Sequence, residues 1–253
     1  MKNLHPYNQT LFVVWGNQIL FWLTTFYVFS SSNFLYFIPL IIIAMYTFGC
    51  MSEVAVHRFF THKSYKTTTL KEKILLIFAL LVGQGATLSW VAVHRNHHAF
   101  EDTPKDPHSP HFIPKWRLVL GLFPKQEFQM NILADLLRSK YKNYFLFENK
   151  YYWIMWAGMW IATYFINFYL FYFLVSGSAL WYLCTQLVNI GCHGTKGKKA
   201  YPNAVGFNSS WINLITGAGH HNNHHGSPKN HSYKFTNEID IYAWVIEKFF
   251  KIS

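Results

Sequence analysis

The chain has 253 residues and a formal net charge of +11, and apolar residues make up 51% of it and aromatic residues 20%. This length suits one sizeable domain better than two, and the apolar content is high for a soluble domain. Lys and Arg are absent between Lys2 and Arg58 and again between Lys150 and Lys196. The charge therefore fits basic loops on one side of a lipid bilayer and argues against nucleic-acid binding. The three cysteines form no CxxC pair, which argues against a disulfide framework or a thiolate metal site.

Four apolar runs, arranged as two pairs, are the candidate membrane spans. They cover about 11–28 and 34–51 in the first pair, and about 152–175 and 179–192 in the second; about 20 apolar residues cross the hydrocarbon core. Only residues 30–33 and 176–178 link the members of each pair, so each pair is predicted to form a tight hairpin. Neither link carries Lys or Arg. The positive-inside rule therefore places the hairpin tips away from the cytoplasm, and the basic segments form a cap on the cytoplasmic side.

A fifth apolar stretch, residues 74–93, has a different character, because its second half contains Gly83, Gln84 and Gly85. If it crossed the membrane, the histidines before it and after it would lie on opposite sides. Histidines that bind a common metal must converge. We therefore predict a re-entrant or interfacial segment here, within a single all-α integral membrane domain that covers residues 1–253.

The 14 histidines are concentrated in spaced motifs. One HxxxxH, two HxxHH and one NxxxH are formed by His57 and His62, by His94, His97 and His98, by His221, His224 and His225, and by Asn189 and His193. Residues three and four apart on a helix share a face, so each HxxHH presents two or three imidazoles in one direction. Each motif lies near the end of an apolar run. The four motifs are therefore expected to meet just outside the membrane.

This set of imidazoles indicates a centre with two metal ions. Neutral imidazole suits Fe, Zn, Cu and Ni, and a site without thiolates is not a zinc finger. Eight or nine imidazoles are too many for one ion, whereas two ions with four or five ligands each use them all. Cleavage of an alkyl C–H bond needs a strong metal-based oxidant. Two metals that act on an apolar substrate in a membrane therefore favour iron and O2.

At these residues the sequence resembles the integral-membrane fatty acid desaturases, specifically their acyl-CoA (stearoyl-CoA-type, delta-9-like) branch. The order of the histidine motifs agrees with that family. The surrounding residues agree as well, with Gly83-Gln84-Gly85 before the second motif, Trp90 four residues before His94, and Asp106-Pro107-His108 after it. The resemblance extends from about residue 11 to residue 234.

The resemblance implies a mushroom-shaped fold in which four transmembrane helices form two hairpins and a cytosolic helical cap holds a di-iron site. The two Fe2+ ions would have as ligands His57, His62, His94, His97, His98, His193, His221, His224 and His225, and Asn189 through a water molecule. The resemblance also implies that Gln84, Trp90 and Thr185 line a kinked tunnel for the acyl chain. Gln186 stands where relatives commonly have Trp, and it is a further predicted substrate contact.

Three residues are predicted to support the ligands, because the second nitrogen of a metal-bound imidazole usually needs a partner. Glu53 lies one turn before His57, and Asp106 follows the second histidine motif. His220 precedes the third motif and stands where an aromatic residue is usual in the family. The histidines without ligand spacing, His108 and His111 among them, are interpreted as solvated or locally hydrogen-bonded.

The predicted activity is that of an oxidoreductase that uses O2 to insert a cis double bond into a fatty acyl chain, with acyl-CoA as the predicted substrate. Electrons are expected from an external donor, cytochrome b5 or ferredoxin with its reductase. The chain has neither a haem-attachment CxxCH nor a four-cysteine iron–sulfur pattern.

Two alternatives remain open. A hydroxylase or other monooxygenase would begin with the same metal chemistry, and the mass of the product separates it from a desaturase. A membrane metal-binding protein without enzymatic activity would bind metal without consuming O2. The sequence also leaves open the chain length, the double-bond position, the acyl carrier (CoA, carrier protein or phospholipid), the oligomeric state, and whether the membrane is a bacterial inner membrane or the endoplasmic reticulum.

Overall fold

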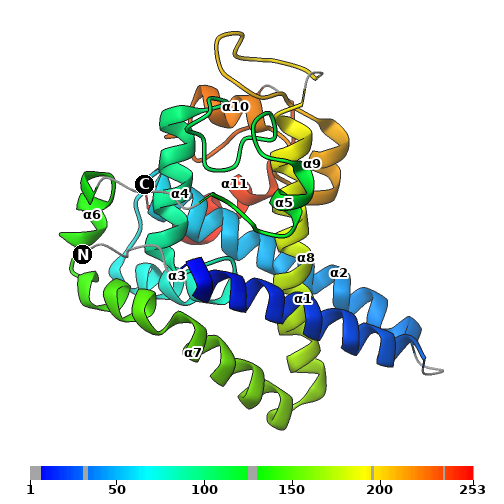
Figure 1. The fold of residues 1–253 in the computed structure, drawn as a ribbon. Helices are drawn as coiled ribbons and strands as arrows, with labels where there is room; N and C mark the ends of the chain where they lie inside the picture. Colours follow the sequence, from blue (N-terminus) through cyan, green and yellow to red (C-terminus); the bar gives the residue numbers. More distant parts are fainter. Residues whose placement is uncertain (1–6, 31–33, 125–129, 195–196, 236, 253) are drawn as a thin grey trace.

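Regular secondary structure is helical in the part of the chain that the computed structural model describes, as the sequence predicts. The described residues are 7–30, 34–124, 130–194, 197–235 and 237–252. Four long helices form a region that we call the stem: α1 (Tyr7–Phe29), α2 (Phe37–Met51), α7 (Lys142–Ile166) and α8 (Phe168–Cys192). The region that we call the cap contains α4 (Thr87–Phe100), α5 (Lys115–Val119), α6 (Ala134–Leu137), α9 (Ser210–Thr216), α10 (His221–Gly226) and α11 (Ile241–Val245). Figure 1 shows α4, α9 and α10 gathered at one end of α8.

The first hairpin of the stem is formed by α1 and α2, which both pack against α8. The predicted link at residues 31–33 lies outside the described residues. Large apolar side chains on these helices, such as Phe26, Tyr27 and Ile43, are more than half exposed, as expected of helices that face lipid. Three described helices are long and apolar enough to cross a membrane: Asn8–Phe29, Phe34–Thr61 and Phe168–Cys192. They make this an integral membrane protein.

The second hairpin differs from the prediction, because the chain does not turn at residues 176–178. Helix α7 ends at Ile166, Asn167 is extended (φ −166°, ψ 125°), and α8 then runs unbroken to Cys192. The predicted boundaries at 152–175 and 179–192 are therefore wrong. The small residues serve packing instead: a Cβ added at Gly177 would lie 2.3 Å from the ring of Phe48. Small residues let membrane helices approach closely. The four-span arrangement stays a prediction.

The stretch predicted as one re-entrant or interfacial segment, 74–93, consists of two short helices. Helix α3 (Thr69–Leu81) and α4 are separated by a turn in which Gly83 has φ +78° and Gly85 has φ +121°. Residues other than glycine rarely adopt these backbone angles. With 13 residues, α3 is about 20 Å long and too short to cross the hydrocarbon core. Its relation to the membrane surface stays a prediction.

The cap is tied to the end of the stem by Arg95 of α4. Its guanidinium donates to the carbonyl oxygens of Phe60 at 2.9 Å and Thr61 at 3.0 Å, and it forms two bonds to the carboxylate of Asp135, at 2.7 and 2.9 Å.

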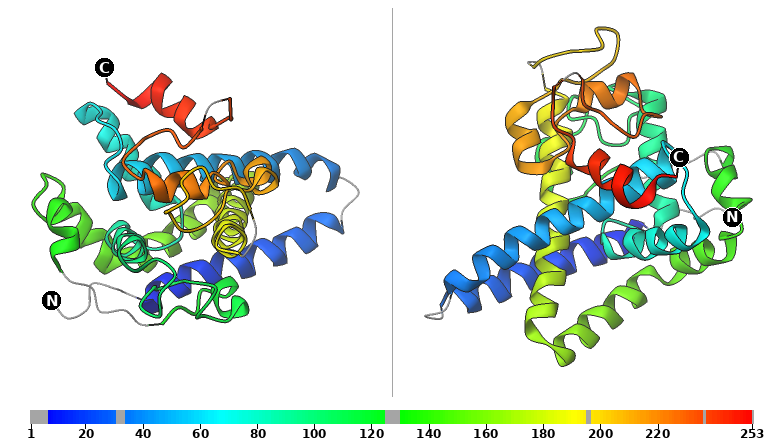
Figure 2. Two further views of the ribbon diagram at one scale, coloured as in Figure 1. Left: turned by 90° about the horizontal axis from the view of Figure 1, so that it is seen from above. Right: turned by 180° about the vertical axis from the view of Figure 1, so that it is seen from behind.

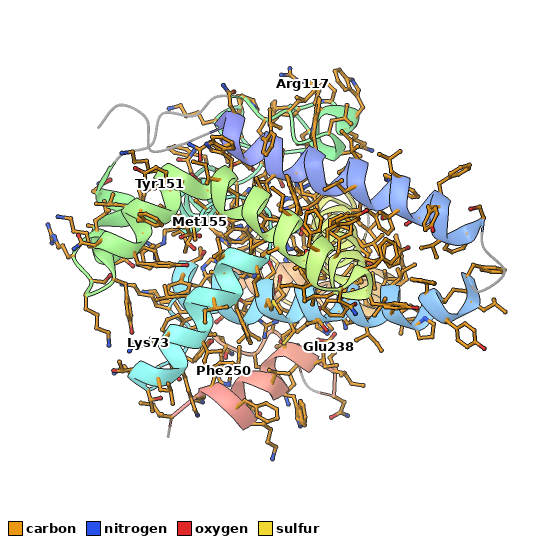
Figure 3. The ribbon with its side chains drawn as sticks, turned by 90° about the horizontal axis from the view of Figure 1, so that it is seen from below. Lys73, Arg117, Tyr151, Met155, Glu238 and Phe250 are labelled. Atoms are coloured by element: carbon orange, nitrogen blue, oxygen red, sulfur yellow. The ribbon has the colours of Figure 1, made fainter. Side chains whose placement is uncertain are left out.

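In the view from above in Figure 2, α8 is seen nearly end-on, with the third histidine motif (orange) beside it. Figure 3 places Lys73 and Arg117 at opposite edges of the molecule, where their side chains point outwards.

The turn between α7 and α8 yields a test of the corrected hairpin. The Asn167 side-chain oxygen accepts the backbone N–H of Leu170 at 3.1 Å, which caps the N-terminus of α8. Asn167→Ala should lower the free energy of unfolding by about 1 kcal/mol, measured by denaturant unfolding in detergent. Asn167→Ser can accept the same bond and is the control. An equal loss in both variants, or none in the alanine variant, would contradict the capping role.

Candidate metal centre

The first histidine motif lies on a π-helical segment. Helix α2 continues directly into η2 (Ser52–Thr61), a π-helix, in which each N–H bonds to the carbonyl five residues back. The last such bond joins His62 N to His57 O at 3.1 Å. Five residues of an α-helix turn through about 500°, which would point the two side chains about 140° apart. The wider π-helical turn brings both imidazoles to one side, and their ring centroids are 5.0 Å apart.

The other motifs lie on or at the ends of helices that converge on this segment. Helix α4 carries His94, His97 and His98, α10 carries His221, His224 and His225, and His193 caps the C-terminus of α8. Glu148 of α7 fixes the start of α4, because its Oε1 accepts both the backbone N–H of Thr87 at 3.1 Å and the Thr87 hydroxyl at 3.0 Å. The imidazoles of four separate chain segments thereby meet in one place.

The histidines form two groups of four, each with one ring nitrogen per residue and all of these nitrogens within 4.8 Å of one another. We call them group A, which is His57, His62, His94 and His224, and group B, which is His97, His193, His221 and His225. His98 lies between them, in a further set with His224 and His225. The structure therefore brings together all nine histidines that were predicted as ligands.

Four carboxylates fix the orientation of five of these rings. The predicted partners Glu53 and Asp106 lie 2.8 Å from Nδ1 of His57 and His97, respectively. Asp102 lies 3.0 Å from Nδ1 of His193. Glu101 is shared, with its Oε1 2.9 Å from Nδ1 of His98 and 2.7 Å from Nδ1 of His225. Since each Nδ1–H donates to a carboxylate, Nε2 of each ring is a bare acceptor that faces the other histidines.

The inward-facing nitrogens cannot satisfy one another. In group B, Nε2 of His193 and Nε2 of His225 lie 2.7 and 2.9 Å from Nε2 of His221, and a single hydrogen on His221 can serve only one of them. The buried Nε2 atoms of His62 and His97 have no hydrogen-bond partner among the described residues. Converging lone pairs of this kind are what a cation with nitrogen ligands requires. The donor set therefore fits two metal ions, one in each group.

Burial keeps these rings in the form that binds metal. It lowers the pKa of seven histidines below the ordinary value of 6.5: His62, His94, His97, His98, His221, His224 and His225. They are neutral at pH 7, and neutral imidazole is the metal ligand. Burial raises the pKa of Asp106 to about 6. This carboxylate also accepts the backbone N–H groups of Asp102 and His108.

Asn189 lies beside group B, in contact with a residue whose role the sequence did not reveal. Its Oδ1 lies 3.1 Å from Nδ1 of His108, and its Nδ2 donates to the His108 carbonyl oxygen at 3.0 Å. The His108 ring is 4.2 Å from the ring of His97. The interpretation of His108 as solvated or locally hydrogen-bonded is therefore wrong, because its partner Asn189 lies 81 residues away in the sequence. The position of His108 directly after Asp106-Pro107 was the available signal. A water-mediated contact from Asn189 to a metal stays a prediction.

The four residues predicted to contact substrate line a single cavity of about 140 Å³ that also reaches the histidines. These four are Gln84, Trp90, Thr185 and Gln186. Gln84 donates to the Thr185 hydroxyl at 3.1 Å, and the Trp90 ring stacks on His94 at 4.9 Å. The cavity wall is mostly apolar. An alkyl chain in it would therefore lie beside His57, His94 and His224 of group A and close to His97 and His221 of group B. Substrate binding there stays a prediction.

His220, predicted to support the ligands, faces away from both groups. Its Nε2 donates to the carbonyl oxygen of Ile239 at 3.1 Å, and its Nδ1 lies 3.4 Å from Glu238. A different pair holds the segment that follows the third motif. Buried Arg58 bonds to Asp240 at 2.9 Å and lies 4.3 Å above the ring of Tyr233, whose ring is 4.8 Å from that of His224 in group A. The sequence alone does not identify Asp240 as the partner of Arg58.

Comparison with known proteins agrees with the site. Residues 32–237 match the fatty acid desaturase family. The chain belongs to this family. The "Delta-9 desaturase-like 2 protein" of Arabidopsis thaliana is 30% identical to this desaturase over 226 residues, which are 83% of this chain and 72% of that protein. The "sn-1 stearoyl-lipid 9-desaturase" of Anabaena variabilis is 29% identical over 230 residues, 83% of this chain and 80% of that protein.

Another relative matches a shorter segment of the chain at higher identity. The "Hex-5-enoyl-[acyl-carrier protein] acetylenase" of Moorena producens (strain JHB) is 48% identical over 58 residues, which are 23% of this chain and 18% of that protein. The prediction of a fatty acid desaturase is thus confirmed. The more specific prediction of the acyl-CoA branch stays a prediction, because the Anabaena variabilis relative is named as a stearoyl-lipid desaturase.

The shared carboxylate yields a test of the metal centre. Glu101→Ala removes the acceptor from both His98 and His225, so the affinity for Fe2+ should fall about 10- to 100-fold, measured by titration of the metal-free protein. Glu72→Ala is the control, because Glu72 pairs with Lys140 at 2.6 Å on the surface. Equal affinities in the two variants would contradict the role of Glu101.

The lowered histidine pKa values yield a second test. Below pH about 6.5 the unfolded chain takes up protons on histidines that the folded, metal-free protein keeps neutral. The free energy of unfolding should therefore be highest above this pH and fall as the pH drops from 7 to 5. The raised pKa values of Asp106 and Glu148 act in the opposite sense, but they are two groups against eight histidines, since burial also lowers the pKa of His108, to about 4. Thermal unfolding of the metal-free protein across this range measures the effect, and a melting temperature that rises towards pH 5 would contradict it.

Proposed function

We propose that this desaturase removes two hydrogens from adjacent carbons of a fatty acyl chain and leaves a cis double bond. In the overall reaction, one O2, two electrons and two protons join the two hydrogens from the substrate to give two water molecules. The observation that carries the proposal is the pair of all-histidine groups beside a mostly apolar cavity. Two iron ions bound in these groups would supply the oxidant that C–H cleavage needs.

The residues of the chain bind the metals and position the substrate in this proposal. The nine histidines hold the metals, with Asn189 acting through water, and the carboxylates that accept from Nδ1 keep the rings aimed inwards. Gln84, Trp90, Thr185 and Gln186 hold the acyl chain beside group A, and the apolar wall excludes water.

Two electrons must come from another protein in this proposal. The chain contains no haem-attachment motif and no iron–sulfur cysteine pattern, so we propose cytochrome b5 or ferredoxin with its reductase as the donor. The cap, which carries the histidines, would face the cytoplasm and meet the donor there. The positive-inside rule supports this side, because residues 30–33 and Asn167, which joins α7 to α8, include no Lys or Arg.

The carrier of the acyl chain is a separate question. The sequence resemblance favours acyl-CoA, whereas the names of the relatives describe a stearoyl-lipid substrate in Anabaena variabilis and a carrier-protein thioester in Moorena producens. We propose acyl-CoA. Incubation of the iron-loaded protein and a donor with one acyl chain on CoA, on carrier protein and in phospholipid tests this. Turnover of the CoA ester alone would support it, and turnover of the lipid alone would contradict it.

The activity itself is tested by gas chromatography–mass spectrometry of fatty acids from cells that express this chain. A new unsaturated acid, two hydrogens lighter than its precursor, should appear and should be absent with His97→Ala, because His97 belongs to group B. His111→Ala is the matched control, since the side chain of this histidine is 42% exposed and lies outside both groups. A product heavier by one oxygen would instead indicate a monooxygenase. Iron-loaded protein that alters no fatty acid when supplied with a donor would contradict the proposal.

A further inference from the structure

The cavity beside the histidines ends about halfway along α8. The residues of α8 that line it run from Asn189 to Trp181, which at 1.5 Å per residue is a length of about 12 Å. Thr10 is the lining residue from α1, and no lining residue comes from α7. Among the described residues, the stem helices are therefore packed together directly beyond Trp181.

The end wall is the indole ring of Trp181, which is buried (2% exposed) between α8 and α2. A Cβ added at Gly49 of α2 would lie 2.7 Å from this ring, so the ring already fills the gap between the two helices. The Tyr242 ring meets it edge-on at 6.2 Å. An alkyl chain that followed the cavity along α8 would stop against this indole.

A second layer closes the stem behind Trp181. Asn17 of α1 donates to the Ser178 hydroxyl at 2.9 Å, and Ser178 donates to the Val82 carbonyl oxygen at 3.1 Å. Trp160 of α7 donates to the Asn17 side-chain oxygen at 2.9 Å. This buried network joins α1, α7, α8 and the end of α3. An alkyl chain could displace it only by leaving buried polar groups unpaired, which is costly.

The end wall lies close to the histidines. Trp90 contacts both His94 and His57, with ring centroids 4.9 and 5.9 Å apart, and Thr185 lines the same cavity. Trp181 precedes Asn189, which lies beside the histidines, by eight residues, or about 12 Å along the helix. The part of the acyl chain between the reacting carbons and the end wall must therefore be shorter than about 12 Å.

We propose that Trp181 limits the length of the acyl chain beyond the reacting carbons, so that the protein places the double bond at a short, fixed distance from the methyl end. The methyl end must be the one that meets Trp181, because the bulky polar acyl carrier cannot enter a closed apolar pocket. The inference rests on the proposed desaturase function and names its substrate class: acyl chains with a short distal segment. The two hydrogens leave adjacent carbons beside group A, and O2, two electrons and two protons convert them to two water molecules, as in the proposed reaction.

The experiment supplies the iron-loaded full-length protein and its donor with saturated acyl chains from hexanoyl to stearoyl on one carrier. The double bond of each product is located by mass spectrometry. In the wild-type protein, it should lie at one constant, short distance from the methyl end for every chain that reacts. Trp181→Leu replaces the indole with a smaller side chain and so lengthens the cavity at its closed end. The double bond should then move one or more carbons away from the methyl end, and Trp181→Phe should move it less.

Trp156→Leu is the matched control, because Trp156 is an equally buried stem tryptophan that does not line the cavity. Its products should keep the wild-type double-bond position even if the total yield falls. Wild-type products with the double bond in the middle of a long chain, at a constant distance from the carboxyl end, would overturn the inference and leave the desaturase function intact. Position is read from whatever product forms, so a partly unfolded variant still gives an answer. No desaturation of any chain by the wild-type protein would overturn the proposed function itself.

Discussion

The hydrogen bonds between carboxylates and histidine Nδ1 atoms are the constraint on which the metal centre depends. Glu53, Glu101, Asp102 and Asp106 occupy the outer nitrogens of five rings, so the inner nitrogens present bare lone pairs to one another. Such an arrangement is unfavourable without a cation, and it suits two metals held by neutral imidazoles. Three of these carboxylates lie in the short segment after α4. One stretch of chain therefore orients rings that belong to α4, α8 and α10.

The scaffold keeps these rings in place through two arginines inside the histidine motifs. Arg58 is almost fully buried and pairs with Asp240, which also caps α11 through the backbone N–H of Ala243 at 2.9 Å. Arg95 links α4 to the last turn of the π-helical segment. Loss of one partner of a buried ion pair leaves an unpaired charge. Arg58 thus holds the segment that follows the third motif against the first motif, and Arg95 does the same for the second motif.

The sequence predicted the site better than the helix boundaries, for physical reasons. Spacing at i, i+3 and i+4 determines which side chains share an α-helical face, so both HxxHH motifs were interpretable. His57 and His62 were predicted as ligands from their place after an apolar run and from the family resemblance. Their spacing alone does not show that the two rings converge, because that depends on a π-helical segment that no local pattern predicts. Ser176, Gly177 and Ser178 resemble a turn, yet Gly177 is needed for contact with Phe48, and only the packed structure reveals that. His108 and Glu101 lack ligand spacing, and their contacts depend on how a loop folds over α8.

Whether the two histidine groups hold two metal ions in one chain can be measured by anaerobic titration of the metal-free protein with Fe2+, followed by iron analysis and Mössbauer spectroscopy. Two irons should bind per chain, and both should show spectra of nitrogen-coordinated ferrous ions. Saturation at a single iron, or failure to bind iron while the protein remains folded, would contradict the two-metal centre.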